Sequence, residues 1–494
     1  MIKKIFTVGT GILISRIFGF IRDVLIASKL GASPINDAFI IAFRLANMFR
    51  NIFADGALNN VFIPEFSRTL KQQDKKEAIN LASLLISILF IVLIIFCSFL
   101  IFFMPSLILV TTSGFNNNYY LFQLTVFFSF VTFPYLLFIS LASFYGSILN
   151  SFQKFFPFSI APVILNLIMI SSILFFDMFG TYGHNLSFAT LIGGILELIW
   201  MQYFLTRNKC NIYFTKIKRN SKVYKIFKRI GPMLISSGVT YINTWTSTII
   251  LSFFSGAISY FYYAERIIQL PISLIGIAIS VVILPIVSKN FTEQKKSFSI
   301  QNDAINFVMF LCIPTCLGIF CLSEDIVTLL FKRGNFTIYD TINTSNTLRL
   351  LSLGLPAFIL IKLFQTKFFA HFNTTTPLLT SLISMIVNIV LSVICIKFYG
   401  FLGIIFANFV SGWINLLFLI YFAKLNFKFS FSRSIINKIF VYTIIACLMI
   451  TIISFYSMIF KGNKNILIFL SKVLLGIILY LGLYFILFKK IKIL

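Results

Sequence analysis

Charged side chains interrupt the first two apolar segments of this chain, where a membrane helix would normally carry none. The polar residues in these segments are Arg16, Arg22 and Asp23, followed by Asp37, Arg44, Asn47, Arg50 and Asp55. Positions 37, 44 and 51 are seven residues apart, so they share one face of a helix. A charge inside a membrane is costly and usually serves a function. This face therefore predicts either a water-filled cavity or a set of internal ion pairs.

The type of basic residue indicates which chemistry such a cavity would perform. A later apolar segment adds Glu265 and Arg266, and the basic residue at every one of these places is arginine. Arginine stays charged and binds phosphate through two parallel hydrogen bonds, so the set suits an anionic substrate such as a diphosphate. The structural alternative is that Arg22, Asp23 and Asp37 neutralise one another and hold helices together. The excess of positive charge favours the substrate site for the set as a whole.

Composition places these residues in a membrane protein. Of the 494 residues, 59% are hydrophobic and 11% are charged, whereas soluble domains carry about 25% charged residues. A spanning helix takes about 20 apolar residues, and the apolar runs predict fourteen such helices. The predicted helices cover 6–28, 35–63, 79–104, 120–149, 157–177, 184–205, 229–254, 259–288, 304–322, 346–371, 377–397, 400–423, 437–460 and 464–488. We therefore expect an all-α polytopic membrane protein.

The remaining reactive residues predict neither a metal site nor a cofactor. The seven cysteines and two histidines show no CxxC or Cys/His ligand spacing, so we also expect no structural disulfide. A net charge of +27 would suit nucleic acid binding in a soluble protein. Here most basic residues lie between apolar runs, which is the pattern of cytoplasmic loops. No nucleic acid partner is expected.

The charges of the loops predict the orientation in the membrane. Residues 207–229 carry nine basic residues and no acid, whereas residues 105–119 carry no charge. With fourteen helices the basic loops fall on one side, so we expect both termini in the cytoplasm. The segment 207–229 also alternates basic with apolar residues, which favours an interfacial helix on anionic lipid over a solvated linker.

Short motifs recur in the same order at an offset of about 220 residues. Phe62-Ile63-Pro64 recurs as Ile283-Leu284-Pro285, and Phe156-Pro157 matches Thr376-Pro377. Six helices per copy predict two lobes related by a pseudo-two-fold axis along the membrane normal, with a cavity between them. The expected parts are an N-lobe at 1–206, a basic interfacial linker at 207–228, a C-lobe at 229–424 and two extra helices at 425–494.

Several longer motifs form a recognisable set. They are Ser15-Arg16-Ile17-Phe18-Gly19-Phe20-Ile21-Arg22-Asp23, Asp37-Ala38-Phe39, Ile52-Phe53-Ala54-Asp55-Gly56-Ala57, Tyr262-Tyr263-Ala264-Glu265-Arg266 and Phe331-Lys332-Arg333-Gly334-Asn335-Phe336. Together they resemble the MurJ (MviN) family of lipid II flippases, in the MOP exporter superfamily. The resemblance runs from about residue 6 to the end of the twelfth predicted helix.

The resemblance implies a transporter of the bacterial inner membrane and not an enzyme. Its substrate would be lipid II, the undecaprenyl-diphosphate-linked peptidoglycan precursor, flipped to the outer leaflet by alternating access. The cavity residues that it implies are Arg16, Arg22, Asp37, Arg50 and Arg266. To these we add Asp23, Arg44, Asn47, Asp55 and Glu265 from the same segments. The last two helices would form a groove for the polyprenyl tail, and we expect a monomer in contact with membrane lipid.

Other functions stay open at this point. Another exporter of the superfamily, for a polysaccharide-linked lipid or a drug, would fit the helices, although a drug-cation exporter should show an excess of carboxylates. A membrane glycosyltransferase would need carboxylates near the outer surface, where Glu324 and Asp325 are the only paired acids. A scaffold for cell-wall enzymes would need no charged cavity.

The predicted orientation determines whether Lys218 can be reached from outside the cell. A Lys218→Cys variant, in a background without the native cysteines, should not react with an impermeant maleimide in intact cells, because the basic loop should be cytoplasmic. The same variant should react after permeabilisation. Strong labelling of intact cells would reverse the orientation.

Overall fold

The computed structural model describes residues 2–52, 59–72, 74–175, 180–216, 245–289, 294–371, 373–427, 429–460 and 465–491. Within these ranges lie sixteen α-helices whose bounds are given below and one short 3-10 helix, residues 245–251 are also helical, and no strand occurs. Ten of the described helical stretches are long and apolar enough to cross a membrane. The prediction of an all-α polytopic membrane protein is confirmed.

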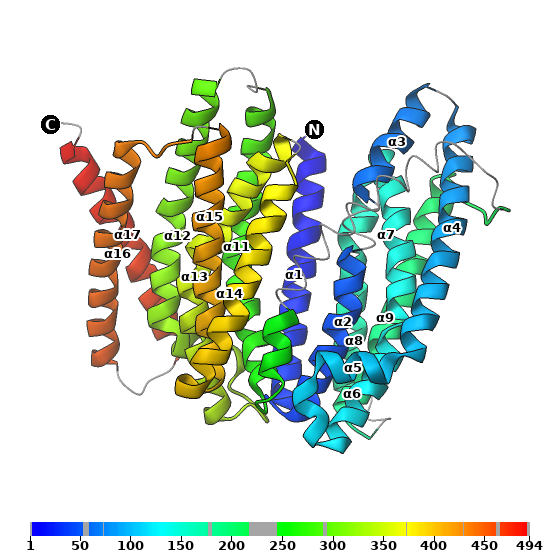
Figure 1. Cartoon of the computed structure of the whole chain (residues 1–494), viewed down its shortest axis with the longest axis horizontal. Coiled ribbons are helices and arrows are strands. Elements are labelled where there is room, and N and C mark those ends of the chain that lie inside the picture. The colour runs from blue at the N-terminus through cyan, green and yellow to red at the C-terminus, as the bar shows by residue number, and fades with distance from the viewer. Residues whose placement is uncertain are drawn as a thin grey trace. The chain divides into compact units, whose positions relative to one another are not determined.

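The chain forms two compact units, shown in Figure 1. Unit 1 contains Met1–Ser259 and Arg333–Phe336, and unit 2 contains Tyr260–Lys332 and Thr337–Leu494. Unit 1 has α1 (Ile2–Leu30), α2 (Pro34–Arg50), α3 (Asn59–Gln72), α4 (Lys75–Phe102), α5 (Met104–Thr111), η2 (Ser113–Asn117), α6 (Tyr119–Thr132), α7 (Tyr135–Ser151), α8 (Phe156–Phe175) and α9 (Tyr182–Arg207). Unit 2 has most of α11 (Ala257–Lys289), then α12 (Gln294–Phe331), α13 (Ile338–Ala370), α14 (Thr375–Tyr399), α15 (Phe401–Phe427), α16 (Arg433–Ile459) and α17 (Ile466–Ile491). The limits predicted for the lobes, and their repeat, stay predictions.

The predicted helices match the observed ones along most of the described chain, but one of them is interrupted. The segment 120–149 is divided into α6 and α7 at Phe133-Pro134, because proline has no N–H to continue the hydrogen-bond ladder. Tyr119–Ser151 still has the length and hydropathy of one membrane span. The segment 35–63 contains nearly all of α2 and the start of α3, and residues 53–58 lie outside the described residues. In unit 2, the acids Glu324 and Asp325 lie inside α12 and not in the expected loop.

A tight turn joins α1 to α2 and fixes where α2 begins. Gly31 has φ of +60°, and a side-chain Cβ there would lie 2.5 Å from the carbonyl oxygen of Asn335, so only glycine fits. The Ser33 side chain accepts a hydrogen bond from the N–H of Asn36, and Pro34 occupies the first turn, which is a favourable start for a helix. Asn335 also donates its backbone N–H to the carbonyl of Ser28 at 2.8 Å. This bond ties the segment Arg333–Phe336 to unit 1.

Small residues let the helices of unit 1 pack closely. On α9, a Cβ added to Gly193 would lie 2.5 Å from Leu165 of α8, and one added to Gly194 would lie 2.5 Å from Tyr135 of α7. Close approach through small residues is a common mode of helix packing in membranes, where hydrophobic burial does not drive association. Gly193 and Gly194 therefore let α8 and α7 pack closely against neighbouring faces of α9.

The chain after α9 is extended, in contrast to the expected interfacial helix. Residues 211–216 have no helical structure, and they run beside α4, where Tyr213 and Thr215 donate backbone N–H groups to the hydroxyls of Ser83 and Ser87 at 3.3 and 2.9 Å. The remainder of the predicted linker, from residue 217 to residue 228, lies outside the described residues. The described part thus gains its backbone hydrogen bonds from α4 and not from a helix of its own.

A buried ion pair attaches the C-terminal helices to the rest of unit 2. Lys472 of α17 lies 2.6 Å from Asp325 of α12, and the two side chains are 8% and 22% exposed. Two tyrosines add hydrogen bonds to α12. The hydroxyl of Tyr480 donates to the carbonyl of Phe310, and the hydroxyl of Tyr442 donates to the side chain of Asn306. Because charge is expensive in an apolar environment, the pair fixes which faces of α12 and α17 meet.

Removing one partner of this pair should destabilise unit 2. Lys472→Met leaves the carboxylate of Asp325 buried without its ammonium, and such losses cost roughly 3–5 kcal/mol in proteins. We expect a lower unfolding temperature in detergent, largely restored in a Lys472→Met/Asp325→Leu variant that has no buried charge. The control is Lys424→Met, at an exposed site of α15. An unchanged unfolding temperature for Lys472→Met would show that the pair does not stabilise the protein.

Candidate functional site

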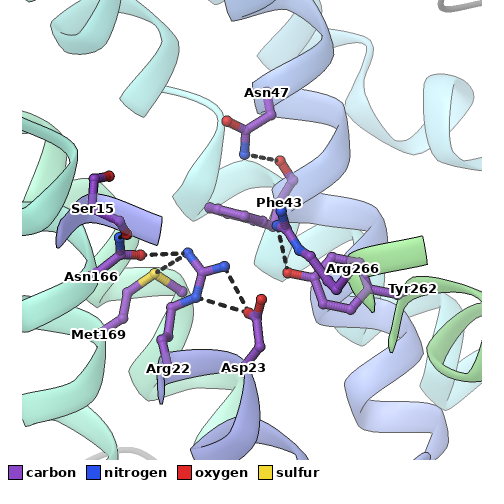
Figure 2. Close-up of polar contacts among 9 residues, drawn as sticks. All are labelled: Ser15, Arg22, Asp23, Phe43, Asn47, Asn166, Met169, Tyr262 and Arg266. Atoms are coloured by element: carbon purple, nitrogen blue, oxygen red, sulfur yellow. Dashed lines mark hydrogen bonds and ion pairs between the residues drawn. The ribbon is translucent and has the colours of Figure 1, made fainter. Parts of the chain in front are cut away.

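Arg22 of α1 lies at the centre of a buried polar cluster in unit 1. Its Nε and Nη2 donate to Asp23 Oδ1 at 3.0 and 2.7 Å, and its Nη1 donates to Asn166 Oδ1 at 2.9 Å. Nη1 also lies 3.8 Å from the sulfur of Met169, and the guanidinium lies 5.2 Å from the centre of the Phe43 ring. Figure 2 shows Asp23, Asn166 and Met169 grouped around the Arg22 guanidinium.

Burial explains why this arginine has so many partners. Arg22 is 4% exposed and Asp23 is 2% exposed, so neither charge can rely on water. The amide of Asn166 also donates to the carbonyl of Ser15 at 3.3 Å, which holds it in the orientation that accepts from Arg22. The ion pair is the internal neutralisation that the sequence analysis gave as the structural alternative for these two residues. It also keeps an arginine charged and in a fixed position inside the unit.

Asp37 of α2 has a different set of partners. Its Oδ2 accepts from the backbone N–H of Gly256 at 2.7 Å, and its Oδ1 accepts from the N–H and the hydroxyl of Ser259 at 2.8 and 2.5 Å. These donors belong to the first turn of α11 and the residue before it. A carboxylate at a helix N-terminus satisfies N–H groups that have no partner within the helix. Asp37 therefore anchors the start of α11 to α2 within unit 1.

Further polar residues follow Asp37 along α2. Arg44 is half-buried and donates from Nη1 to the hydroxyl of Thr248 at 3.3 Å. Arg50 is half-buried and donates to the amide oxygens of Asn47 and Asn51 at 3.2 and 2.9 Å. Asn47 in turn donates to the carbonyl of Phe43 at 2.8 Å (Figure 2). Arg44 and Arg50 both lie on α2, about 120° apart around the helix, and both are less enclosed than Arg22.

Arg16 and Asp55 differ from the other candidates of the first two segments. Arg16 is exposed on α1, two turns before Arg22. Asp55 lies outside the described residues.

The two candidates in unit 2 lie next to each other on α11. Arg266 is half-buried and donates from Nη2 to the hydroxyl of Tyr262 at 2.8 Å, with its guanidinium 4.8 Å from the centre of that ring (Figure 2). Glu265 is also half-buried. The tyrosine at i−4 thus orients the guanidinium of Arg266 through a hydrogen bond and a cation–π contact.

Several partners of these residues were missed in the sequence analysis. Asn166 had a signal, because it is a lone amide in an apolar segment, but its contact with Arg22 crosses 144 positions. Thr248 and Ser259 gave no signal, since small hydroxyl residues are common in membrane helices. Gly256 contributes only a backbone N–H, which no side-chain pattern reveals.

The arrangement offers hydrogen-bond donors for an anion. The part of the chain that the structure describes contains no group of three His, Cys, Asp or Glu residues that could hold a metal ion. Arginine side chains on α1 and α2 present planar N–H donors in unit 1, and Arg266 does so in unit 2. Such donors match phosphate oxygens in geometry and charge.

Sequence comparison agrees with these features. The family model described as lipid II flippase MurJ matches residues 26–475. A probable lipid II flippase MurJ of Rickettsia prowazekii (strain Madrid E) is 36% identical over 482 residues, which are 95% of this chain and 94% of that protein.

Solved structures give the same result. One described as lipid II flippase MurJ in an inward closed conformation has a TM-score of 0.82 and 29% identity, covering 98% of this chain and 99% of that one. An inward-facing multidrug resistance MATE transporter of the MOP superfamily has a TM-score of 0.70 at 15% identity, covering 84% and 94% of the two chains, which is a likeness of fold alone. The match to the family model and the relatives over almost the whole length leads to one conclusion: this chain belongs to the MurJ family of lipid II flippases.

Proposed function

We propose that this protein flips lipid II from the cytoplasmic to the outer leaflet of the bacterial inner membrane by alternating access. The observation that carries the proposal is the family match over residues 26–475. The protein acts as a transporter and not as an enzyme. Lipid II and the surrounding membrane lipid are its partners, and it functions as a monomer with both termini in the cytoplasm.

The charges of the first two helices support an anionic head group as the transported part. Residues 16–50 contain five basic residues and two acids. One acid, Asp23, bonds to Arg22, and the other, Asp37, bonds to the start of α11. The net charge of this region is therefore positive. A diphosphate that leaves water needs fixed positive donors in place of its hydration shell.

Burial separates the arginines into two roles in this proposal. Arg22, at 4% exposure and bonded to Asp23 and Asn166, provides a fixed positive charge. Arg16, Arg44, Arg50 and Arg266 are exposed or half-buried, so in this proposal these less enclosed side chains are the ones that turn towards a head group. Asp37 and Asn47 position α2, and Glu265 adjoins Arg266 on α11.

Loss of a half-buried arginine should weaken binding of the head group without unfolding the protein. A charge-assisted hydrogen bond contributes roughly 1.5–3 kcal/mol, so Arg50→Ala and Arg266→Ala should each weaken head-group binding by roughly tenfold to a hundredfold. Arg→Lys keeps the charge but loses the two-pronged geometry and should restore function only in part.

The measurement is growth and lipid II flipping in a strain depleted of its own flippase, with each variant confirmed in the membrane. Lys424→Ala, at an exposed position of α15, removes one positive charge elsewhere and should flip normally. Normal flipping by both Arg50→Ala and Arg266→Ala would contradict the proposed role of these arginines.

Arg22 should behave differently, because its charge is neutralised inside unit 1. Arg22→Ala leaves Asp23 buried without its partner and should lower the unfolding temperature and the amount of folded protein. Arg22→Ala/Asp23→Ala removes both charges, so it should recover stability while flipping stays low. If the double variant flips at the normal rate, Arg22 serves only to neutralise Asp23. Comparing unfolding temperature with flipping rate separates the two roles.

A further inference from the structure

A cavity lies where three helices of unit 1 end, away from the arginines described above. It occurs between the end of α7, the start of α8 and the end of α9, and has a volume of about 400 Å³. Lys154 and Arg207 line it together with the amides of Gln153 and Asn208 and with rings that include Phe156 and Phe204. Phe156 is ten residues from Asn166 on α8, which is about 15 Å along a helix. The cavity is therefore separate from the Arg22 cluster.

The walls of this cavity are held by local backbone structure. Lys154 donates its N–H to the carbonyl of Leu149 at 2.9 Å, and Gln153 adopts φ of +61°, an uncommon conformation for a residue other than glycine. On the opposite wall, the side chain of Asn208 donates to the carbonyl of Phe204 at 2.7 Å. These contacts shape the cavity from the protein's own groups, without a ligand.

Aromatic residues indicate the depth of the cavity in the membrane. Trp200 of α9 donates from Nε1 to the carbonyl of Pro157 at 3.1 Å, and its ring centre lies 4.8 Å from that of Phe204. Tyr203, on the same helix, is exposed. Tryptophan and tyrosine gather at the level of lipid head groups, with their rings in the apolar region and their polar atoms outward. The cavity thus opens at the head-group level.

The chemistry of the lining selects an amphipathic anion. Lys154 and Arg207 are both exposed, and the residues that line the cavity include no acid. Phe155, Phe156, Pro157 and Phe204 provide an apolar wall beside these cations. A soluble anion would use the cations only, whereas a phospholipid would place its phosphate on the cations and its glycerol and first methylenes on the rings.

We propose that this cavity binds the head group of an anionic glycerophospholipid from the surrounding leaflet. The phosphate lies between Lys154 and Arg207, the amides of Gln153 and Asn208 bind the polar head, and the acyl chains begin on Phe156 and Phe204. The site lies on the side that the loop charges predict to be cytoplasmic, where anionic lipids concentrate. It does not depend on lipid II being the transported substrate.

The experiment uses Trp200 as the reporter. The chain has three tryptophans, so Trp245→Phe and Trp413→Phe leave Trp200 alone. The full-length variant with Trp200 alone is reconstituted in phosphatidylcholine vesicles. These vesicles contain increasing fractions of phosphatidylglycerol that is brominated near the start of its acyl chains. The fluorescence of Trp200 is recorded at each fraction. Brominated phosphatidylcholine is the neutral counterpart. Thermal unfolding confirms that each variant is folded.

We expect phosphatidylglycerol to quench Trp200 at a much lower mole fraction than phosphatidylcholine does. A basic residue near a charged bilayer strengthens binding by about fivefold. Lys154→Gln/Arg207→Gln should therefore raise the mole fraction of phosphatidylglycerol that quenches half of the Trp200 fluorescence by roughly 25-fold. The matched control, Lys424→Gln/Arg433→Gln, removes two exposed cations from α15 and α16 and should leave the titration unchanged.

Three results would overturn the proposal. The first is equal quenching by the two brominated lipids in the protein with both cations present. The second is an unchanged titration in Lys154→Gln/Arg207→Gln. The third is complete displacement of phosphatidylglycerol by millimolar inorganic phosphate, which would identify a site for soluble anions. Sodium chloride at the same ionic strength is the control for phosphate, because salt weakens surface attraction in general.

Discussion

The Arg22–Asp23 ion pair is the interaction on which the rest of unit 1 depends. Both residues lie on α1 and are almost fully buried, and a charge in a membrane needs a partner because water is excluded. Asp23 balances the charge, Asn166 of α8 accepts a further hydrogen bond, and the ring of Phe43 brings α2 against the guanidinium. One arginine thereby fixes three helices and retains its positive charge.

The other polar residues of the first two helices have different surroundings and different roles. Asp37 is used for structure, since it accepts hydrogen bonds from the first turn of α11 and the residue before it. Arg44 and Arg50 remain half-buried on α2, and in the proposed function their donors serve the substrate. A membrane protein that carries a diphosphate needs both kinds of residue, because positive charges without structural support would separate the helices. In that proposal the buried pair provides the support, and the half-buried arginines bind the head group.

The sequence predicted the fold well where hydropathy decides the structure. The apolar runs at 157–177 and 377–397 match α8 and α14 closely, because an uninterrupted apolar run in lipid must be a helix. Helical spacing also determines that positions 37, 44 and 51 of the second segment share a face, and the cavity expected along that face stays a prediction. The sequence could not predict that Asn166 contacts Arg22, because contacts between distant helices depend on packing. Nor could it predict the partner of Asp37, since backbone N–H groups are the same in every residue.

The central claim is that this chain moves lipid II between leaflets, and reconstitution tests it most directly. The purified full-length protein would be placed in vesicles with fluorescent lipid II, and an impermeant quencher would report the fraction in the outer leaflet over time. The account predicts that lipid II crosses far faster than in vesicles without protein, and that Arg50→Ala slows it while Lys424→Ala does not. Equal rates with and without protein, under an imposed membrane potential and ion gradients, would contradict the claim.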